Sequence, residues 1–402
     1  MTEVNKQRLF IASCFALITT AFAFAIRAGI MNDLAKTMDM SDTQLGWINF
    51  MGAFGFPIAT LVGGPLYNSI GPKKLGWVAV GCHFVAITFS LLSSSILPLF
   101  FSTFFISFGN GMVEAAYNPM IADMYEDNKA TMLNKFHVWF PGGLAIGSLI
   151  AYFITQMEGT WQVKLAVMYI PLAIYGFLFY GQTFPKTANE MDKASTSSNV
   201  KAIFSSPLYW FMLLCMILTA TTELGTQSWV ERILGNTGAQ PLLILFLVTG
   251  LMAVGRYFAG PIIHKLNIPG VLWISSIISL IAIYMLSTAT GGMVYVAAVM
   301  FAIGVCYFWP NMISFVAVYL PKTGALGMSL IGGVGMVGLS ICQPIIGKWM
   351  DSERANAIAT GLQGDAAELA AGQATLDNIA WFPAILVIAF GILYFTRKKY
   401  TP

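Results

Sequence analysis

Residues 64–74 read Gly-Pro-Leu-Tyr-Asn-Ser-Ile-Gly-Pro-Lys-Lys, a short basic stretch between apolar runs over about 44–67 and 75–96. Each run has roughly the 20 residues that a helix needs to cross the hydrocarbon core of a bilayer. The basic stretch between them is long enough only for a turn. This region therefore predicts two neighbouring helices that cross a membrane in opposite directions.

The composition of the whole chain agrees with a membrane protein. Of its 402 residues, 57% are hydrophobic and 10% are charged, whereas about 25% of an ordinary soluble domain is charged. A soluble protein with this composition would expose enough apolar surface to aggregate. The composition excludes a soluble enzyme, a nucleic-acid-binding protein, a disordered scaffold and a secreted disulfide protein. We expect a polytopic protein whose partners include the lipid bilayer but no nucleic acid.

Twelve apolar runs between polar breaks have the length of a spanning helix. Their approximate ranges are 8–32, 44–67, 75–96, 98–124, 133–156, 163–183, 205–230, 240–263, 270–288, 292–319, 325–350 and 377–396. Residues 351–376 are rich in Ala and Gly with scattered acidic residues, and we expect an extramembrane loop there. The polar residues 185–201 predict a flexible linker after the sixth run.

These runs predict an all-α polytopic membrane protein with twelve transmembrane helices in two six-helix bundles. The bundles would cover residues 1–184 and 204–402, with a cytoplasmic linker at 185–203. Most Lys and Arg residues of the loops and tails fall on the side that holds both termini, so the positive-inside rule predicts cytoplasmic termini. We expect a monomeric, multi-pass protein of the plasma (inner) membrane. The first run is too long for the core of a signal peptide.

Several features recur between the two halves of the chain at one constant offset. Gly64-Pro65-Leu66 ends the second run and Gly260-Pro261-Ile262 ends the eighth, and a basic turn follows each. The same offset relates Arg27 in the first run to Glu223 in the seventh. Such symmetry is typical of transporters built from two related halves. We therefore expect a pseudo-two-fold axis, with Arg27 and Glu223 facing each other across a central cavity.

The stretch 64–74 resembles the motif G-x-L-a-D-r-x-G-r-k-x, which the major facilitator superfamily has between its second and third helices. The matching residues are Gly64, Leu66, Gly71 and Lys73. The Asp and the first Arg of the motif are Asn68 and Ser69 here. The resemblance implies the major facilitator fold, with gating or structural roles for the two glycines and the lysine. Arg256 and Gly260 resemble the corresponding part of the eighth helix, and the same roles are expected for them.

Within that superfamily, the fourth run is most similar to the fucose–proton symporter-like sugar transporters. It contains Gly109, Glu114, Asn118 and Pro119 in the pattern G-x-x-x-x-E-x-x-x-N-P, and the first run ends near Asp33. This resemblance implies that Glu114 and Asp33 are proton-coupling carboxylates.

The seventh and tenth runs extend the same resemblance. Residues 223–229 resemble an E-x-x-x-x-S-W pattern, and residues 309–311 resemble an aromatic-proline turn. His137 and Phe140 replace amides of the fucose transporters, and Arg27 is an additional cation in the first run. Fucose itself is therefore not implied as the substrate.

Glu114 is the strongest functional candidate among the few charges inside the runs. Asn110, Tyr117 and Asn118 lie at positions i−4, i+3 and i+4 from it, and we expect all four on one helix face. A charge near the bilayer centre costs about 2.5–3.5 kcal/mol, so this face is expected to turn toward a cavity. Glu114 can accept and release a proton there. A static ion pair with Arg27 and a direct substrate contact are the alternatives.

Three other polar residues have more than one possible role. Arg27 can pair with Glu114 or Glu223, or it can bind a carboxylate or phosphate of the substrate. Arg256 is expected to make a structural or gating contact near the cytoplasmic end of the eighth run. His137 can change charge near neutral pH or donate to a hydroxyl, or it can be a satisfied buried histidine.

A sugar offers hydroxyls to polar side chains and C–H faces to aromatic rings. Residues that fit this chemistry near the middle of a run are Tyr117, Asn118, Trp139, Gln227, Trp229, Tyr307, Trp309 and Asn311. All of these except Trp229 form the predicted substrate site together with Arg27, His137 and Glu223. Packing or interfacial anchoring is the competing role for each aromatic residue. The three histidines and five cysteines show no metal-ligand or disulfide spacing, so we expect no metal and no cofactor.

The sequence thus predicts a secondary active transporter and not an enzyme. The leading hypothesis is proton-coupled symport of a sugar or sugar derivative by alternating access. The alternative is an organic-anion transporter for a sugar acid or a phosphorylated compound, in which Arg27 binds the anionic group. A channel or lipid-handling protein would not need a repeat with central carboxylates. A membrane-embedded enzyme would need a nucleophile–base or metal cluster, and the sequence shows neither.

Overall fold

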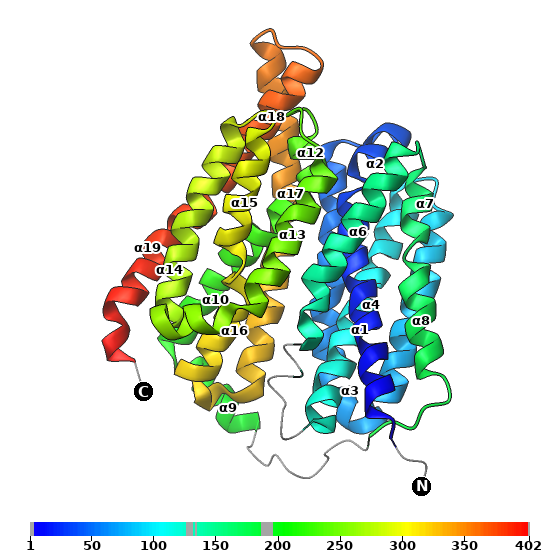
Figure 1. Cartoon of the computed structure of the whole chain (residues 1–402), viewed down its shortest axis with the longest axis vertical. Helices are drawn as coiled ribbons and strands as arrows, with labels where there is room; N and C mark the ends of the chain where they lie inside the picture. The colour runs from blue at the N-terminus through cyan, green and yellow to red at the C-terminus, as the bar shows by residue number, and fades with distance from the viewer. Residues whose placement is uncertain (1–3, 126–131, 133–134, 186–195, 401–402) are drawn as a thin grey trace. The chain divides into compact units, whose positions relative to one another are not determined.

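The computed structural model describes residues 4–125, 132, 135–185 and 196–400, and every regular element in these residues is a helix (Figure 1). Eleven helical segments in them are long and apolar enough to cross a membrane. A further apolar helix, α13 (Pro241–Tyr257), has 17 residues. These segments account for the twelve predicted spans, and the all-α, two-bundle fold class is confirmed.

The chain forms two compact units. The first contains Met1–Met40 and Trp47–Met191, and the second contains Ser41–Gly46 and Asp192–Pro402. The units follow the two halves of the sequence except at Ser41–Gly46. This short segment belongs to the N-terminal half of the chain, but it packs with the second unit.

The first unit is built around a central helix, α1. Its helices are α1 (Lys6–Ala28), α2 (Met31–Thr37), most of α3 (Asp42–Leu91), α4 (Ile96–Met124), α6 (Trp139–Gln156), α7 (Trp161–Ala166) and α8 (Tyr169–Phe179). Helix α1 packs against α4, α6 and α8 and is buried over most of its length. A Cβ atom on Gly143 or Gly147 of α6 would lie 2.7 or 2.9 Å from the Cβ of Ala21 or Ala25. Small residues therefore let α1 and α6 approach closely, as is common between membrane helices.

The second unit contains more interrupted helices than the first. They are α9 (Thr196–Phe204), α10 (Pro207–Ala220), the π-helical η2 (Thr221–Gly225), α11 (Thr226–Ser228), α12 (Val230–Leu234), α13, α14 (Ala259–Thr288), α15 (Met293–Val305), α16 (Phe308–Tyr319), η3 (Pro321–Thr323), α17 (Gly324–Ala359), α18 (Asp365–Ile379), α19 (Trp381–Thr396) and η4 (Arg397–Lys399). The seventh predicted span is divided among four of these segments, and the tenth is divided between α15 and α16. Such breaks free backbone groups inside a bundle, where they can bind side chains or cargo.

Helices α3 and α14 each contain one break at a left-handed residue. In α3 it is Gly71, with φ 80° and ψ 164°, and in α14 it is Asn267, with φ 56° and ψ 165°. The offset that relates Gly64 to Gly260 also relates these two positions. The backbone therefore confirms the internal repeat that the sequence predicts.

Two predicted loop regions are partly helical. Residues 186–195 of the expected linker lie outside the described residues, but Thr196–Phe204 forms α9. The expected loop at 351–376 is wrong, since α17 continues to Ala359 and α18 begins at Asp365. Alanine has the highest helix propensity, so this alanine-rich segment favours helix despite its polar character. The two helices run upward beyond the neighbouring α13 and α15 of the second unit in Figure 1.

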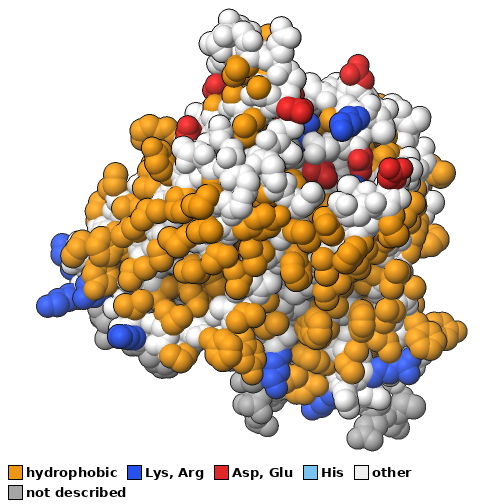
Figure 2. Space-filling view, turned by 45° about the horizontal axis from the view of Figure 1, so that its top comes forward, with side chains coloured by type: hydrophobic (Ala, Val, Ile, Leu, Met, Phe, Trp, Pro, Cys, Tyr) orange, Lys and Arg blue, Asp and Glu red, His pale blue; other side chains and the backbone are white. Residues whose placement is uncertain are grey.

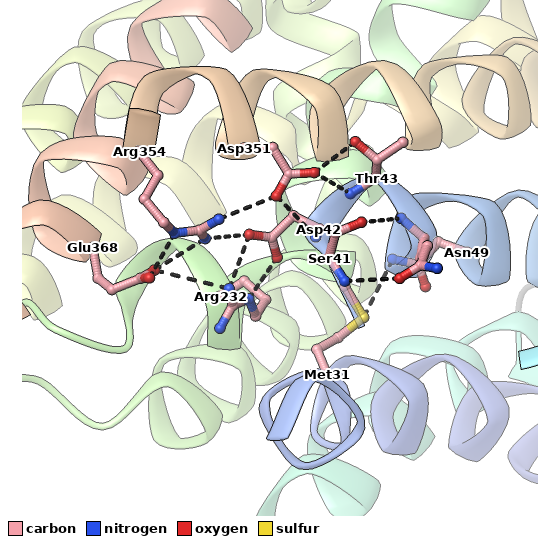
Figure 3. Close-up of polar contacts among 10 residues, drawn as sticks. Met31, Ser41, Asp42, Thr43, Asn49, Arg232, Asp351, Arg354 and Glu368 are labelled. Atoms are coloured by element: carbon pink, nitrogen blue, oxygen red, sulfur yellow. Dashed lines mark hydrogen bonds and ion pairs between the residues drawn. The ribbon is translucent and has the colours of Figure 1, made fainter. Parts of the chain in front are cut away.

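The first turn of α3 is held in the second unit by α17. Asp351 accepts the backbone N–H groups of Asp42 and Thr43 at 3.0 and 2.8 Å, and the Thr43 hydroxyl at 2.6 Å (Figure 3). This carboxylate caps the N-terminus of α3, where unpaired N–H groups favour an anion. Gly347 permits the approach, because a Cβ atom on it would lie 2.2 Å from the Asp42 carbonyl oxygen.

Two arginines neutralise the fully buried Asp42 carboxylate in the same network. The Arg232 Nε donates to Asp42 Oδ1 at 2.6 Å, and Arg354 donates to Asp42 Oδ2. Arg354 also donates to Glu368 Oε1 at 2.6 Å. The sequence gives no sign of this network, because its members come from α3, α12, α17 and α18, which are far apart along the chain.

The flanks of the units expose many large hydrophobic side chains. Phe84 and Phe177 in the first unit are 56% and 72% exposed, and Tyr284 and Phe395 in the second are 65% and 70% exposed. Figure 2 shows hydrophobic side chains over the middle of the face that it draws. In water this surface would be unfavourable, whereas in a bilayer it contacts lipid.

Candidate functional site

Glu114, Asn118 and His137 form a polar cluster in the first unit. Glu114 and Asn118 are one turn apart on α4, and the Asn118 Nδ2 donates to Glu114 Oε2. The His137 Nε2 lies 3.0 Å from Asn118 Oδ1 and 4.0 Å from Glu114 Oε2. The side chain of His137 is 46% exposed and that of Glu114 is 16% exposed. The cluster thus joins a carboxylate of low exposure to a half-exposed histidine.

Tyr117 does not share this face, contrary to prediction. Its side chain is fully buried, and its ring stacks on Phe179 with a centroid distance of 4.8 Å. Positions i+3 and i+4 differ by about 100° around a helix axis, so Tyr117 points into the bundle while Asn118 points to the cluster. The assignment of Tyr117 to the substrate site is therefore corrected to a packing role.

Asn110 belongs to a second histidine–asparagine pair on α4. His83 Nε2 lies 2.9 Å from Asn110 Oδ1, and His83 Nδ1 lies 3.0 Å from the Tyr175 hydroxyl. All three side chains are fully buried. This network joins α3, α4 and α8, so the predicted polar face of α4 carries two separate clusters.

Arg27 is buried in the first unit without an acidic partner. Its Nη1 donates to the Gly52 carbonyl oxygen at 3.0 Å, and its guanidinium carbon lies 4.8 Å from the Phe24 ring centroid. Only 7% of the residue is exposed, and no hydrogen-bond partner of its Nε is found among the described residues. None of the ion pairs between described residues includes Arg27. The hypothesis of a pair with Glu114 is therefore wrong for this structure, and a pair with Glu223 stays a prediction.

Asp33 forms an ion pair that the sequence analysis missed. Lys164 Nζ donates to Asp33 Oδ2 at 2.8 Å and to the Gly29 carbonyl oxygen at 3.0 Å. The lysine side chain is only 1% exposed, so it depends on this partner. Lys164 lies on the short helix α7, inside the predicted run 163–183. Asp33 is thus tied to a fixed cation, unlike Glu114.

In the second unit, Glu223 pairs with Arg256. Arg256 Nη2 donates to Glu223 Oε1 at 2.9 Å, and Arg256 Nε donates to the Cys306 carbonyl oxygen at 3.0 Å. The Tyr307 hydroxyl donates to the Gly255 carbonyl oxygen at 3.0 Å. The interruption between α15 and α16 supplies the Cys306 carbonyl, and η2 carries Glu223. From the sequence we expected Glu223 in the substrate site and Arg256 in a structural or gating contact. In the structure the two side chains form an ion pair.

The other predicted residues of the second unit have different surroundings. Asn311 is 1% exposed, and neither of its amide atoms has a partner in the described part of the chain. The Trp309 ring lies beside Gly332 and Gly335 of α17. Gln227 Nε2 lies 3.4 Å from Met252 Sδ. Asn311 therefore keeps the most hydrogen-bonding capacity among these candidates.

The remaining predicted positions contribute little to a site in the described residues. Trp139 begins α6 and is 41% exposed. Lys73 is exposed beside the Gly71 break, while the surroundings of Gly64 and Gly260 lie outside what the structure describes. The described residues also contain no cluster of three or more His, Cys, Asp or Glu side chains that could hold a metal ion.

Residues 9–343 match the family model described as Major Facilitator Superfamily. The chain belongs to this superfamily. Members of this superfamily are transporters rather than enzymes, and the chain is accordingly a membrane-spanning transporter of small molecules. The resemblance of residues 64–74 to the motif of the major facilitator superfamily is confirmed at the level of the superfamily.

The relatives are distant. A putative niacin/nicotinamide transporter, NiaP, of Bacillus subtilis (strain 168) is 21% identical over 306 residues, which cover 71% of each protein. Human protein spinster homolog 3 is 23% identical over 162 residues, 39% of this chain and 31% of that protein. The crystal structure of a D-xylose–proton symporter has a TM-score of 0.79 at 12% identity, covering 98% of both chains. At that identity the likeness establishes the fold alone.

Proposed function

We propose that this protein is a proton-coupled symporter of a small sugar derivative with an anionic group, such as a sugar acid. The observation that supports it most is Arg27, a buried cation without a carboxylate partner in the described residues. Arginine keeps its charge in proteins, so it cannot avoid the penalty of burial by losing a proton. A carboxylate or phosphate on the cargo would neutralise it and bind its free Nε.

The surroundings of Arg27 suit an anion that binds and leaves. Gly52 provides the space for the guanidinium, because a Cβ atom there would lie 2.1 Å from Arg27 Nη1. The Phe24 ring supports the cation without neutralising it. These points favour an anionic cargo over the neutral sugar of the leading hypothesis.

Glu114 is the proposed proton site in this mechanism. Its one basic neighbour within 4.0 Å in the described residues is His137. Asp33 has the weaker case, since Lys164 holds it in an ion pair. The proposed bundles, 1–184 and 204–402 with the linker 185–203, would alternate access to the site by rocking.

Transport by purified protein in liposomes tests the cargo charge. We expect counterflow of D-glucuronate or D-glucose 6-phosphate to exceed that of D-glucose, and Arg27→Gln to abolish this preference. The loss should be about tenfold or more, because a hydrogen bond to a charged group contributes about 1.5–3 kcal/mol. Lys36→Gln is the matched control, since it removes one exposed positive charge from the same unit. Equal anion counterflow in Arg27→Gln and the control would refute the proposal.

Symport of a neutral sugar is the second candidate. It is supported by Asn311, whose free amide donor and acceptor suit a hydroxyl group. In that case D-glucose or another neutral sugar would exchange well, and Arg27→Gln would not reduce its uptake.

We also propose a monomer in the plasma (inner) membrane with both termini in the cytoplasm. In the sequence, most Lys and Arg residues of the predicted loops and tails fall on the side that holds both termini. This separation is the one that the positive-inside rule expects. Labelling of a cysteine placed beside Lys398, from one side of the membrane at a time, tests the orientation.

A further inference from the structure

The Asn118 amide lies between the Glu114 carboxylate and the His137 ring. Its Nδ2 donates to Glu114 Oε2, and its Oδ1 lies 3.0 Å from His137 Nε2. An ionised carboxylate can only accept hydrogen bonds, so the amide must turn its Nδ2 toward Glu114. Its oxygen then faces His137, whose Nε2 must carry a hydrogen. The orientation of one amide thus fixes which histidine nitrogen is protonated.

A second arrangement, with the amide rotated, also satisfies all three groups. If Glu114 gains a proton, its O–H can donate to Asn118 Oδ1 after the amide rotates by half a turn. The Asn118 Nδ2 then faces His137 Nε2, which must have a free lone pair to accept. We propose that Asn118 is a positioning residue that, by this rotation, ties the protonation of Glu114 to that of His137. The inference rests on the proposed function, because it takes Glu114 as the proton-coupling carboxylate.

The proton balance of this step is complete. A proton from water first binds Nδ1 of neutral His137, whose side chain is 46% exposed. The proton on Nε2 then passes to Glu114, while Nδ1 keeps its own. The histidine ends neutral, the carboxylate ends as a carboxylic acid, and the amide has rotated. The 4.0 Å between Nε2 and Oε2 exceeds a hydrogen bond, so the transfer passes through one water molecule.

Three other charged or titratable side chains of the first unit have hydrogen-bond partners outside this cluster. Arg27 donates to Gly52, and Lys164 binds Asp33. His83 is fully buried between Asn110 and Tyr175. The Asn110 Nδ2 has no partner in the described residues, whereas the Asn118 Nδ2 has Glu114. The two histidine–asparagine pairs on α4 therefore differ in exposure and in the carboxylate, which only the pair of Asn118 and His137 has beside it.

Infrared difference spectroscopy of the full-length protein in liposomes tests the coupling without any cargo. The C=O band of the protonated Glu114 carboxyl is identified by its loss in Glu114→Gln, and its pH midpoint is measured. We expect His137→Gln to move this midpoint by about one pH unit more in the wild-type background than in the Asn118→Ala background. The near-isosteric Asn118→Asp should remove the coupling in the same way. His83→Gln is the matched control and should leave the midpoint in place.

Equal shifts on His137→Gln with and without Asn118 would overturn the inference, since a direct charge effect does not need the amide. The proposed function fails by a different result. If Glu114→Gln still accumulates D-glucuronate against a gradient when a proton gradient is imposed, Glu114 is not the coupling site, whatever its spectrum shows.

Discussion

Arg27 in the first unit and Glu223 in the second occupy equivalent positions of the repeat, yet their charges are treated differently. Glu223 has Arg256 at 2.9 Å. Arg27 has a backbone carbonyl and a ring, but no carboxylate in the described residues. The two halves of the repeat share a backbone arrangement, but an ion-pair partner present in one half can be absent from the other. The unpartnered charge is the one that remains available to a cargo.

The largest expected effect concerns Glu114, the proposed proton site of the first unit. We expect Glu114→Gln to abolish proton-driven accumulation and to leave exchange of substrate intact, because a neutral amide cannot carry the proton. Glu223→Gln should retain proton-driven accumulation if the comparison holds. Uptake with and without an imposed proton gradient measures both. Wild-type accumulation in Glu114→Gln would end the role assigned to that residue.

The next effect separates a paired from an unpaired buried charge. Arg256→Gln leaves Glu223 without its cation, and breaking a buried pair in this way destabilises by about 3 kcal/mol. Arg27→Gln removes a cation but leaves no carboxylate of the described residues without its partner, so it should not lower stability. The midpoint of thermal unfolding in detergent compares the two variants. A larger loss in Arg27→Gln would mean that Arg27 has an acidic partner after all.

The smallest effect concerns the two helix breaks. Gly71→Ala forces a Cβ into a region that only glycine adopts easily, with an expected loss of about 1–3 kcal/mol. Asn267→Gly relieves similar strain but removes the hydrogen bond from Gly270 N to Asn267 Oδ1 at 3.0 Å. These terms oppose each other, so we expect a change within about 0.5 kcal/mol. Unfolding midpoints check both, and a large loss in Asn267→Gly would show that the cap dominates.

The repeat illustrates how much of the fold was predictable. Glycine and proline positions, apolar runs and basic turns are local signals, and they located the spans and the equivalence of Gly64 with Gly260. Residues 351–376 were predicted less well, because a polar alanine-rich segment resembles a loop by hydropathy and a helix by propensity. Inside a long apolar run, hydropathy also gave no sign of the π-helical turn at Thr221–Gly225.

The sequence predicted which residues belong to the candidate site, but not how they contact one another. Glu114, Asn118 and His137 were all singled out, since polar residues inside spans are rare and therefore visible. Their mutual geometry was not visible, because His137 lies on a different part of the chain from α4. Tyr117 was wrongly assigned to the polar face of α4. Positions three and four residues from Glu114 both lie near it on a helix, and the sequence does not show which of them points into the bundle.

The sequence by itself determined that this chain crosses a membrane in two related halves, because hydropathy and length act locally along each helix. Tertiary structure decided which charges meet. Lys164 with Asp33, Arg256 with Glu223 and the network around Asp42 join segments far apart in the chain. Burial makes such pairing strongly favourable compared with leaving a charge alone. Arg27, left without a carboxylate in the described residues, is notable for that physical reason.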